Sequence, residues 1–204
     1  MDYEWDVFLS YLHEQPSGSW VNDHFLPFFT FQLGNALNQR AKVFYDRGGI
    51  RLGQKWPTRL KSALARSRCL VGIWAPLYFH SDWCLSECAV MLHREARLGY
   101  GTNQNPDGLV IGVKVNDGDS FPPYAADSQY ADFEPFFFDG PAFLQSPLHL
   151  EFQKAIRPLA ADVARVVKGV PPWSVEWETD PWLEDIVKKV QLPGKPQVAQ
   201  PLIA

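Results

Sequence analysis

Short apolar runs alternate along the chain with longer segments in which apolar residues recur every three to four positions. The runs are rich in β-branched and aromatic residues, which favours β-strands. They occupy residues 4–10, 41–46, 68–74, 109–115 and, in a shorter form, 130–133. This alternation of strands and helices predicts an α/β fold, a flavodoxin-like five-stranded parallel sheet with helices on both faces.

Local signals predict where the helices begin and which residues they bury. Residues 10–20 contain Pro and Gly-Ser and are predicted to form a loop, with Asn22 and Asp23 capping the next helix. The inward residues of that helix are predicted to be Phe25, Phe28, Phe29, Leu33, Ala36 and Leu37. A second helix runs from Pro57 to Arg66, with Leu60, Ala63 and Leu64 inward. The last one spans residues 148–167, with Pro158 as a kink or break and with Leu150, Phe152, Ile156, Leu159, Val163 and Val166 inward.

The segment from Tyr78 to Arg97 is predicted to contain a helix with unusual side chains. Ser81 is a suitable N-cap, and Asp82 places a negative charge in the first turn. A helical wheel puts one apolar arc toward the core, formed by Leu85, Cys88, Ala89, Leu92 and Ala96. Glu87 falls opposite that arc, within reach of Trp83 four residues earlier. The pattern leaves two interpretations of Glu87 open, a functional carboxylate or a solvated helix residue.

Composition narrows the class of protein. The chain has 204 residues, 46% hydrophobic content and a formal net charge of −4 without a basic run, which argues against nucleic-acid and anionic-membrane partners. The N-terminal stretch lacks a signal-peptide pattern, and no apolar run approaches the roughly 18 residues of a membrane helix. Three cysteines without zinc-ligand spacing indicate free thiols, so we expect a cytoplasmic location.

A crevice is expected at one edge of the predicted sheet. In parallel sheets, ligands bind at the carboxyl ends of the strands, and Ser10, Asp46 and Ala75 end strands on that edge. The glycine-rich segment Arg47–Trp56 follows the second strand and matches neither a phosphate-binding loop nor a dinucleotide fingerprint. Residues 1–168 are predicted to form the domain, and the Trp- and Pro-rich residues 169–204 a C-terminal extension with a short helix near residues 181–190.

Motifs along residues 3–168 resemble the TIR (Toll/interleukin-1 receptor) domain family. DVFLSY (6–11) is similar to the first-strand box, and VFYDRGGIRLGQKW (43–56) to the second strand with its BB loop. SRCLVGIWAPLYFHSDWCLSE (67–87) is similar to the third strand, the turn after it and the W-x-x-x-E helix start. PPYAADSQYADF (122–133) is similar to the last-strand region. The resemblance implies the TIR fold, of a bacterial type like the NAD-cleaving TIR enzymes of antiphage defence (Thoeris-like).

The resemblance also implies site residues. In enzymatic TIR domains a glutamate on the third helix, preceded by a tryptophan, marks cleavage of the nicotinamide–ribose bond of NAD+, so Glu87 is expected to be catalytic. The residues expected to bind the substrate are Trp83, Ser10, Tyr11, Asp46, Tyr78 and Ser81. Each of them also has an ordinary role in packing or capping. Many catalytic relatives carry arginines where Leu12 and His13 stand, and His13 and Arg51 are the expected substitutes for that positive charge.

Two functions of different classes therefore remain. The first is an NAD+ nucleosidase or cyclase that gives nicotinamide and ADP-ribose or a cyclic ADP-ribose signal in antiviral defence. It needs no cofactor or metal, since NAD+ is the substrate, and its expected partners are a downstream effector and a second copy bound through Arg47–Trp56. The second is a non-catalytic TIR–TIR interaction module. A response-regulator domain fits the layout only, because the strand ends lack its acidic cluster.

Overall fold

The computed structural model describes residues 2–46, 58–119, 121–126 and 128–179. Its strands form one five-stranded sheet in the order β2-β1-β3-β4-β5, with every neighbouring pair parallel. The strands are β1 (Trp5–Ser10), β2 (Val43–Phe44), β3 (Ser67–Trp74), β4 (Val110–Lys114) and β5 (Tyr130–Asp132). This confirms the predicted α/β fold, since each strand lies within or one residue beyond its predicted run. The order reverses between β1 and β3, which is where doubly wound sheets open a crevice.

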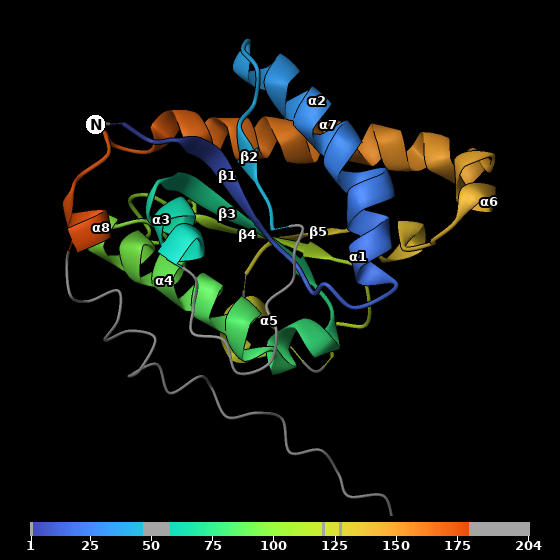
Figure 1. Ribbon diagram of the computed structural model, residues 1–204, viewed down its shortest axis with the longest axis horizontal. Helices are drawn as coiled ribbons and strands as arrows, with labels where there is room; N and C mark the ends of the chain where they lie inside the picture. Colours follow the sequence, from blue (N-terminus) through green and yellow to red (C-terminus); the bar gives the residue numbers. More distant parts are fainter. Residues whose placement is uncertain (1, 47–57, 120, 127, 180–204) are drawn as a thin grey trace, which may run out of the picture.

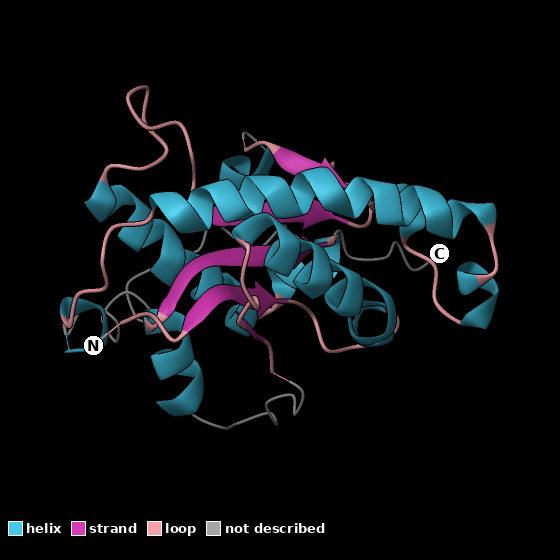
Figure 2. Ribbon diagram, turned by 90° about the horizontal axis from the view of Figure 1, so that it is seen from above, coloured by secondary structure: helices cyan, strands magenta, loops and turns pink. Residues whose placement is uncertain are grey.

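Helices cover both faces of the sheet. They are α1 (Ser17–Trp20), α2 (Leu26–Leu37), α3 (Thr58–Ala65), α4 (Asp82–Leu98), α5 (Pro123–Ala126), α6 (Pro141–Leu144), α7 (Pro147–Gly169) and α8 (Glu176–Thr179). Three short helical segments of other types are the π-helix η1 (Val21–Phe25) and the 3-10 helices η2 (Pro76–His80) and η3 (Glu134–Phe136). Figure 1 shows α2 and α7 on one side of the sheet and α3 and α4 on the other. Seen from above, α7 crosses the sheet along much of the molecule (Figure 2).

The segment after β1 differs from the prediction. Residues 17–20 are helical and continue without a break through η1 into α2, where a loop was expected. Asn22 lies inside this segment and its side-chain nitrogen donates to the Gly18 carbonyl at 2.6 Å, so it is not an N-cap. The reason is tertiary burial, because Trp20 and Phe25 are fully buried and stack on one another. That burial outweighs the weak local helix preference of the Gly-Ser sequence.

The inward face of α4 also differs from the helical wheel. Glu87 and Arg94 are buried on it together with Cys84, Cys88 and Met91. From the predicted arc, Leu85 and Cys88 are buried, Ala89 and Leu92 are half-buried, and Ala96 is exposed. The wheel is wrong here because it sorts residues by polarity alone, whereas a polar side chain is buried wherever another part of the chain supplies its partner.

The other helices match their predictions more closely. Leu60, Ala63 and Leu64 are buried on α3, and Ser81 caps α4 by accepting from the Cys84 N–H at 3.4 Å. On α7 the inward residues are buried apart from Leu150, which is 55% exposed. Of the predicted kink or break at Pro158, the break is absent, because α7 continues past this residue.

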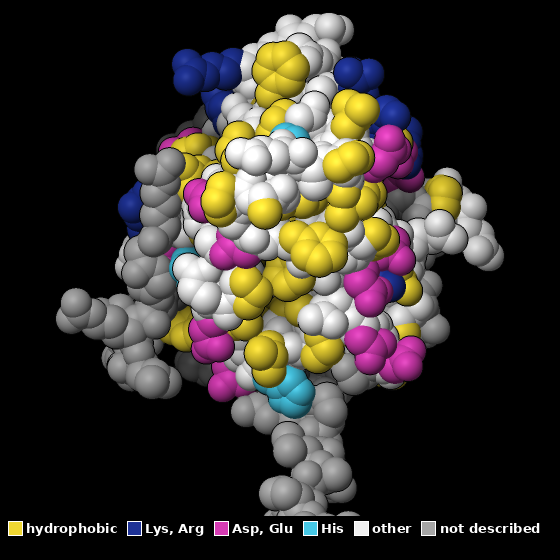
Figure 3. Space-filling model, turned by 90° about the vertical axis from the view of Figure 1, so that its right-hand side faces the viewer, with side chains coloured by type: hydrophobic (Ala, Val, Ile, Leu, Met, Phe, Trp, Pro, Cys, Tyr) yellow, Lys and Arg dark blue, Asp and Glu magenta, His cyan; other side chains and the backbone are white. Residues whose placement is uncertain are grey.

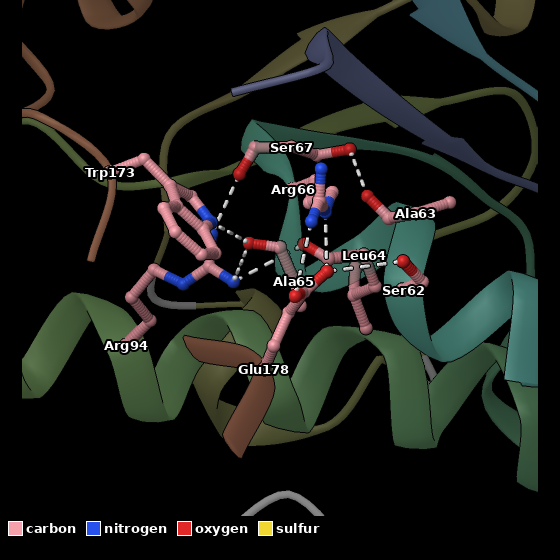
Figure 4. A network of polar contacts seen from close by, with 9 residues as sticks. All are labelled: Ser62, Ala63, Leu64, Ala65, Arg66, Ser67, Arg94, Trp173 and Glu178. Atoms are coloured by element: carbon pink, nitrogen blue, oxygen red, sulfur yellow. Dashed lines mark hydrogen bonds and ion pairs between the residues drawn. The ribbon is translucent and has the colours of Figure 1, made fainter. Parts of the chain in front are cut away.

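The first part of the predicted extension packs on the amino ends of the strands (Figure 4). Trp177 is buried, with the Arg94 guanidinium 5.2 Å from its ring centroid. Glu178 forms an ion pair with Arg66 and accepts a hydrogen bond from Ser62. The predicted boundary between residues 168 and 169 coincides with the end of α7, and the division into two units stays a prediction. The helix predicted near residues 181–190 lies outside the described residues.

Candidate active site

A cavity of about 540 Å³ opens at the carboxyl ends of β1 and β2, beside the first turns of α4. Its position is the one predicted for a ligand crevice in this class of sheet. The lining comes from β1 and the segment after it, from Asp46 just beyond β2, and from α3, the turn η2 and α4. The lining residues are Phe8, Leu9, Tyr11, Leu12, His13, Glu14, Asp46, Leu60, Leu77, His80, Ser81, Asp82, Trp83, Cys84 and Glu87.

Glu87 is the buried carboxyl of this cavity. Glu87 is 7% exposed, and its Oε2 accepts a hydrogen bond from the Ser10 hydroxyl at 2.5 Å. Ser10 ends β1 and Glu87 lies in the second turn of α4, so the contact joins the sheet edge to the helix. The prediction that Glu87 faces away from the apolar arc is wrong, whereas its placement at the sheet crevice is as expected.

The protonation of Glu87 is strongly perturbed. Burial raises the pKa of Glu87 to about 8, the Ser10 hydrogen bond opposes that rise, and the nearby Asp46 charge adds to it. With this pKa the carboxyl is mainly protonated at neutral pH. A cation in the cavity would favour the ionised form, because opposite charge lowers the pKa of a carboxyl.

The other predicted site residues fall into two groups. Tyr11, Asp46, Ser81 and Trp83 line the cavity with Glu87. The Tyr11 hydroxyl donates to the Asp46 carbonyl at 2.8 Å and so ties the ends of β1 and β2 together.

Ser10 and Tyr78 form the second group, outside the cavity lining. Both are buried, and their hydroxyl oxygens lie 2.8 Å apart. They contact Glu87 from behind, through the Ser10 hydroxyl, and the role in substrate binding that the sequence suggested for them stays a prediction.

Two histidines belong to the cavity. His13 stacks on the Tyr11 ring with a centroid distance of 4.6 Å. Burial lowers the pKa of His13 against the opposing effect of Asp46, which favours the neutral imidazole. His80 was missed by sequence reasoning, although its position directly before the Ser81 cap, at the carboxyl edge of β3, could have indicated it.

The remaining expectations concern self-association, metal binding, membrane helices and the cysteines. Residues 47–57, which include the predicted self-association segment, Arg51 and Trp56, lie outside the described residues. In the part of the chain that the structure describes, no three His, Cys, Asp or Glu side chains gather as a metal site would require. No described helix combines the length and the apolar character needed to cross a bilayer. All three cysteines are free and buried.

Comparison with known proteins gives the family. The family model for the TIR domain matches residues 7–144, more than half of the chain. The chain belongs to the TIR domain family. No curated protein matches it. Among solved structures, it is similar to the TIR domains of the activated Roq1 resistosome directly recognizing the pathogen effector XopQ, at 18% sequence identity, 92% coverage of this chain, 97% coverage of that chain and a TM-score of 0.38.

Membership of the TIR family limits the possible functions to two classes but does not choose between them. TIR domains have signalling roles, and the family contains NAD-cleaving enzymes as well as non-catalytic members. Between these two classes, the chemistry of the cavity around Glu87 has to decide.

Proposed function

We propose that this TIR domain is an NAD+ nucleosidase, which breaks the bond between nicotinamide and ribose. The observation that carries the proposal is the placement of Glu87, a buried carboxyl inside a cavity at the carboxyl edge of the sheet. The volume of about 540 Å³ falls within the range of small-molecule sites. Half-buried Trp83 lines the same cavity and offers an aromatic surface for a cationic ring.

The chemistry requires little beyond charge and position. As the C–N bond breaks, its electron pair returns to the ring nitrogen, and nicotinamide leaves as a neutral molecule. Positive charge then develops on the ribose ring, in an oxocarbenium-like transition state that an ionised Glu87 would stabilise. Attack by water gives ADP-ribose and a proton, whereas attack by the substrate's own adenine or a ribose hydroxyl gives a cyclic product.

The raised pKa of Glu87 fits such a substrate. The nicotinamide ring of NAD+ carries a positive charge, so its entry beside the carboxyl favours loss of the Glu87 proton. The pH dependence of kcat/KM reports the pKa values of the free enzyme. We therefore expect kcat/KM to rise with pH, with a midpoint near the Glu87 pKa of about 8. The midpoint in kcat should lie lower, since the bound cation holds the carboxyl ionised.

The test is turnover by the purified protein. We expect incubation with NAD+ to release nicotinamide, detected by chromatography and mass spectrometry, and Glu87→Gln to reduce the rate at least about 100-fold, since charge stabilisation in such sites is worth roughly 3 kcal/mol. Glu151→Gln, an exposed glutamate on α7, is the matched control and should keep the parent rate. Equal rates for the parent and Glu87→Gln, or no turnover by the parent at any protein concentration, would favour the non-catalytic interaction module.

The sequence motifs also suggest what the product does and how the protein associates. We infer that the product acts as a nucleotide signal for a downstream effector in bacterial antiviral defence, and that two copies associate through residues 47–56. Both inferences rest on the sequence motifs, and mass spectrometry of the product distinguishes linear ADP-ribose from a cyclic linkage.

A further inference from the structure

A chain of hydrogen-bonding groups continues behind Glu87 into the core. The Ser10 hydroxyl donates to Glu87 at 2.5 Å, the Tyr78 hydroxyl lies 2.8 Å from the Ser10 oxygen, and the Cys88 sulfur lies 3.0 Å from the Tyr78 oxygen. Ser10, Tyr78 and Cys88 are each at most 1% exposed. The chain connects β1, the turn η2 and α4, three elements whose sequence positions give no sign of this contact.

The backbone leaves room for this arrangement at a glycine. Gly72 of β3 is the register partner of Ser10, and a Cβ added at Gly72 would lie 3.3 Å from the Tyr78 hydroxyl and 2.5 Å from the Trp74 indole nitrogen. A side chain at this position would therefore push against the hydroxyl that reaches Ser10. The close approach of Tyr78 to Ser10 thus depends on the absence of a side chain on the neighbouring strand.

Counting hydrogens fixes the direction of the chain when Glu87 is ionised. Ser10 has one hydroxyl hydrogen, which it gives to the carboxylate, so its oxygen can only accept, and the available donor is Tyr78. The single hydrogen of Tyr78 is then used, so its oxygen accepts from the Cys88 thiol. Every hydrogen points toward Glu87.

A proton on Glu87 allows the opposite direction. The carboxylic O–H donates to Ser10, the Ser10 hydroxyl turns to the Tyr78 oxygen, and the Tyr78 hydroxyl turns to the Cys84 carbonyl oxygen, which lies 3.5 Å away. The Ser10 and Tyr78 hydroxyl hydrogens therefore each have an acceptor in both states, although these groups are buried. The hydroxyls only rotate, and the proton itself leaves Glu87 toward the cavity.

We propose that Tyr78 is a positioning residue for Glu87: it orients a reversible hydrogen-bond chain, Cys88–Tyr78–Ser10–Glu87, that serves both the protonated and the ionised carboxyl. Its contribution to catalysis rests on the proposed function, whereas the chain itself does not. The Tyr78 hydroxyl polarises Ser10 toward the carboxylate and thereby favours the ionised form.

Other titratable groups around Glu87 do not reproduce this effect. Burial raises the pKa values of Tyr78 and Cys84 well above the ordinary values and that of Cys88 to about 12, so these three stay neutral while Glu87 titrates. Asp46, two residues beyond β2, acts on Glu87 through its charge. The other titratable residues that line the cavity are Tyr11, His13 and Glu14 from the segment after β1, His80 from η2 and Asp82 from α4.

The test follows the Glu87 proton directly. The infrared band of its protonated carboxyl, assigned by its loss in Glu87→Gln, is recorded against pH. Tyr78→Phe should raise the midpoint by about 0.5 pH unit and Ser10→Ala by about 1 pH unit, because the hydrogen bonds lost are charge-assisted, and therefore stronger, in the ionised form. Tyr100→Phe is the matched control, since its hydroxyl also donates one hydrogen bond, at 2.7 Å to the Gly169 carbonyl, and it should leave the midpoint unchanged.

The outcomes separate the chain from the enzyme activity. An unchanged infrared midpoint in folded Tyr78→Phe would overturn the proposal. Shifted infrared midpoints support it, and kcat/KM midpoints that fail to follow them would contradict the proposed function alone. If Tyr78→Phe does not fold, Cys88→Ala and Cys88→Ser decide: alanine should raise the midpoint, and serine, which keeps a donor, should restore it. Equal midpoints in these two variants would overturn the proposal.

Discussion

Glu87 experiences opposing effects within one small region of the fold. Burial and the Asp46 charge disfavour its ionised form, whereas the Ser10 hydroxyl supports it. An unfolded glutamate ionises near pH 4.5, while folded Glu87 does so near pH 8. Between these values the folded state binds the extra proton, so the contribution of Glu87 to stability is full below pH 4.5 and is lost as pH rises toward 8.

This balance predicts a variant that is more stable and less active. Glu87→Gln cannot ionise, so its free energy of unfolding should match that of the parent near pH 4.5 and exceed it by on the order of 4 kcal/mol at pH 8. Urea unfolding across this pH range measures the difference, and exposed Glu151→Gln should show none. A difference that stays constant with pH would mean that Glu87 ionises alike in the folded and unfolded chains.

At the scale of elements, the segment from Val170 to Thr179 completes the core at the edge opposite the cavity. Arg94 is a fully buried cation whose guanidinium donates to the carbonyls of Ser67 at 2.6 Å, Ala65 at 3.1 Å and Leu64 at 3.2 Å. Leu64 and Ala65 end α3, so the negative end of that helix faces the cation. Trp177 covers the same guanidinium, and the Trp173 indole donates to the Ala65 carbonyl at 3.3 Å. Figure 4 shows the hydrogen bonds of Arg94 and Trp173 converging between α3 and α4.

Removal of the Trp177 ring should therefore weaken the whole domain. Trp177→Ala uncovers buried Arg94 and leaves a cavity, which should reduce the free energy of unfolding by about 3–5 kcal/mol. Val175→Ala, in the same segment but 52% exposed, is the control and should change it by less than about 0.5 kcal/mol. Urea denaturation with circular dichroism measures both, and equal midpoints for the two variants would contradict a packing role for Trp177.

At the scale of the molecule, apolar surface lies in more than one place. Three apolar side chains here are each at least 50% exposed: Phe138 before α6, Leu144 at the end of α6 and Leu150 in the first turn of α7. Figure 3 looks at this side and shows apolar side chains gathered there. Exposed Leu77, in contrast, lines the cavity. The sequence assigns self-association to a third place, residues 47–56, with Ile50, Leu52 and Trp56 as its apolar members.

If two copies must associate through residues 47–56 to complete the site, activity depends on protein concentration. Specific activity should rise with concentration, because mass action populates the assembled form, and Leu52→Asp should suppress that rise. Leu144→Asp introduces the same charge on α6 and is the control. Activity assays paired with light scattering measure both quantities. Flat specific activity in a protein that stays monomeric would contradict this mechanism, as would equal suppression by Leu144→Asp.

Local pattern by itself determined the sheet, most of the helices and the position of the cavity. Strand residues of the central β3 form a nearly continuous apolar run because both faces of the sheet are covered. Ser81 was identifiable as a cap because a capping bond joins residues three apart. The carboxyl edge, with Tyr11, Asp46 and Trp83, followed from the order of strands along the chain, since parallel strands end at the same edge.

Tertiary structure alone decided which polar side chains are buried and what they touch. Glu87 faces inward because Ser10, 77 residues away in sequence, supplies its hydrogen bond. Arg94 is buried because carbonyls at the end of α3 and the start of β3 accept its hydrogens. A helical wheel contains none of these partners, so it turned Glu87 toward solvent. Polar groups are buried where distant parts of the chain satisfy them, and that condition is met only once the chain has folded.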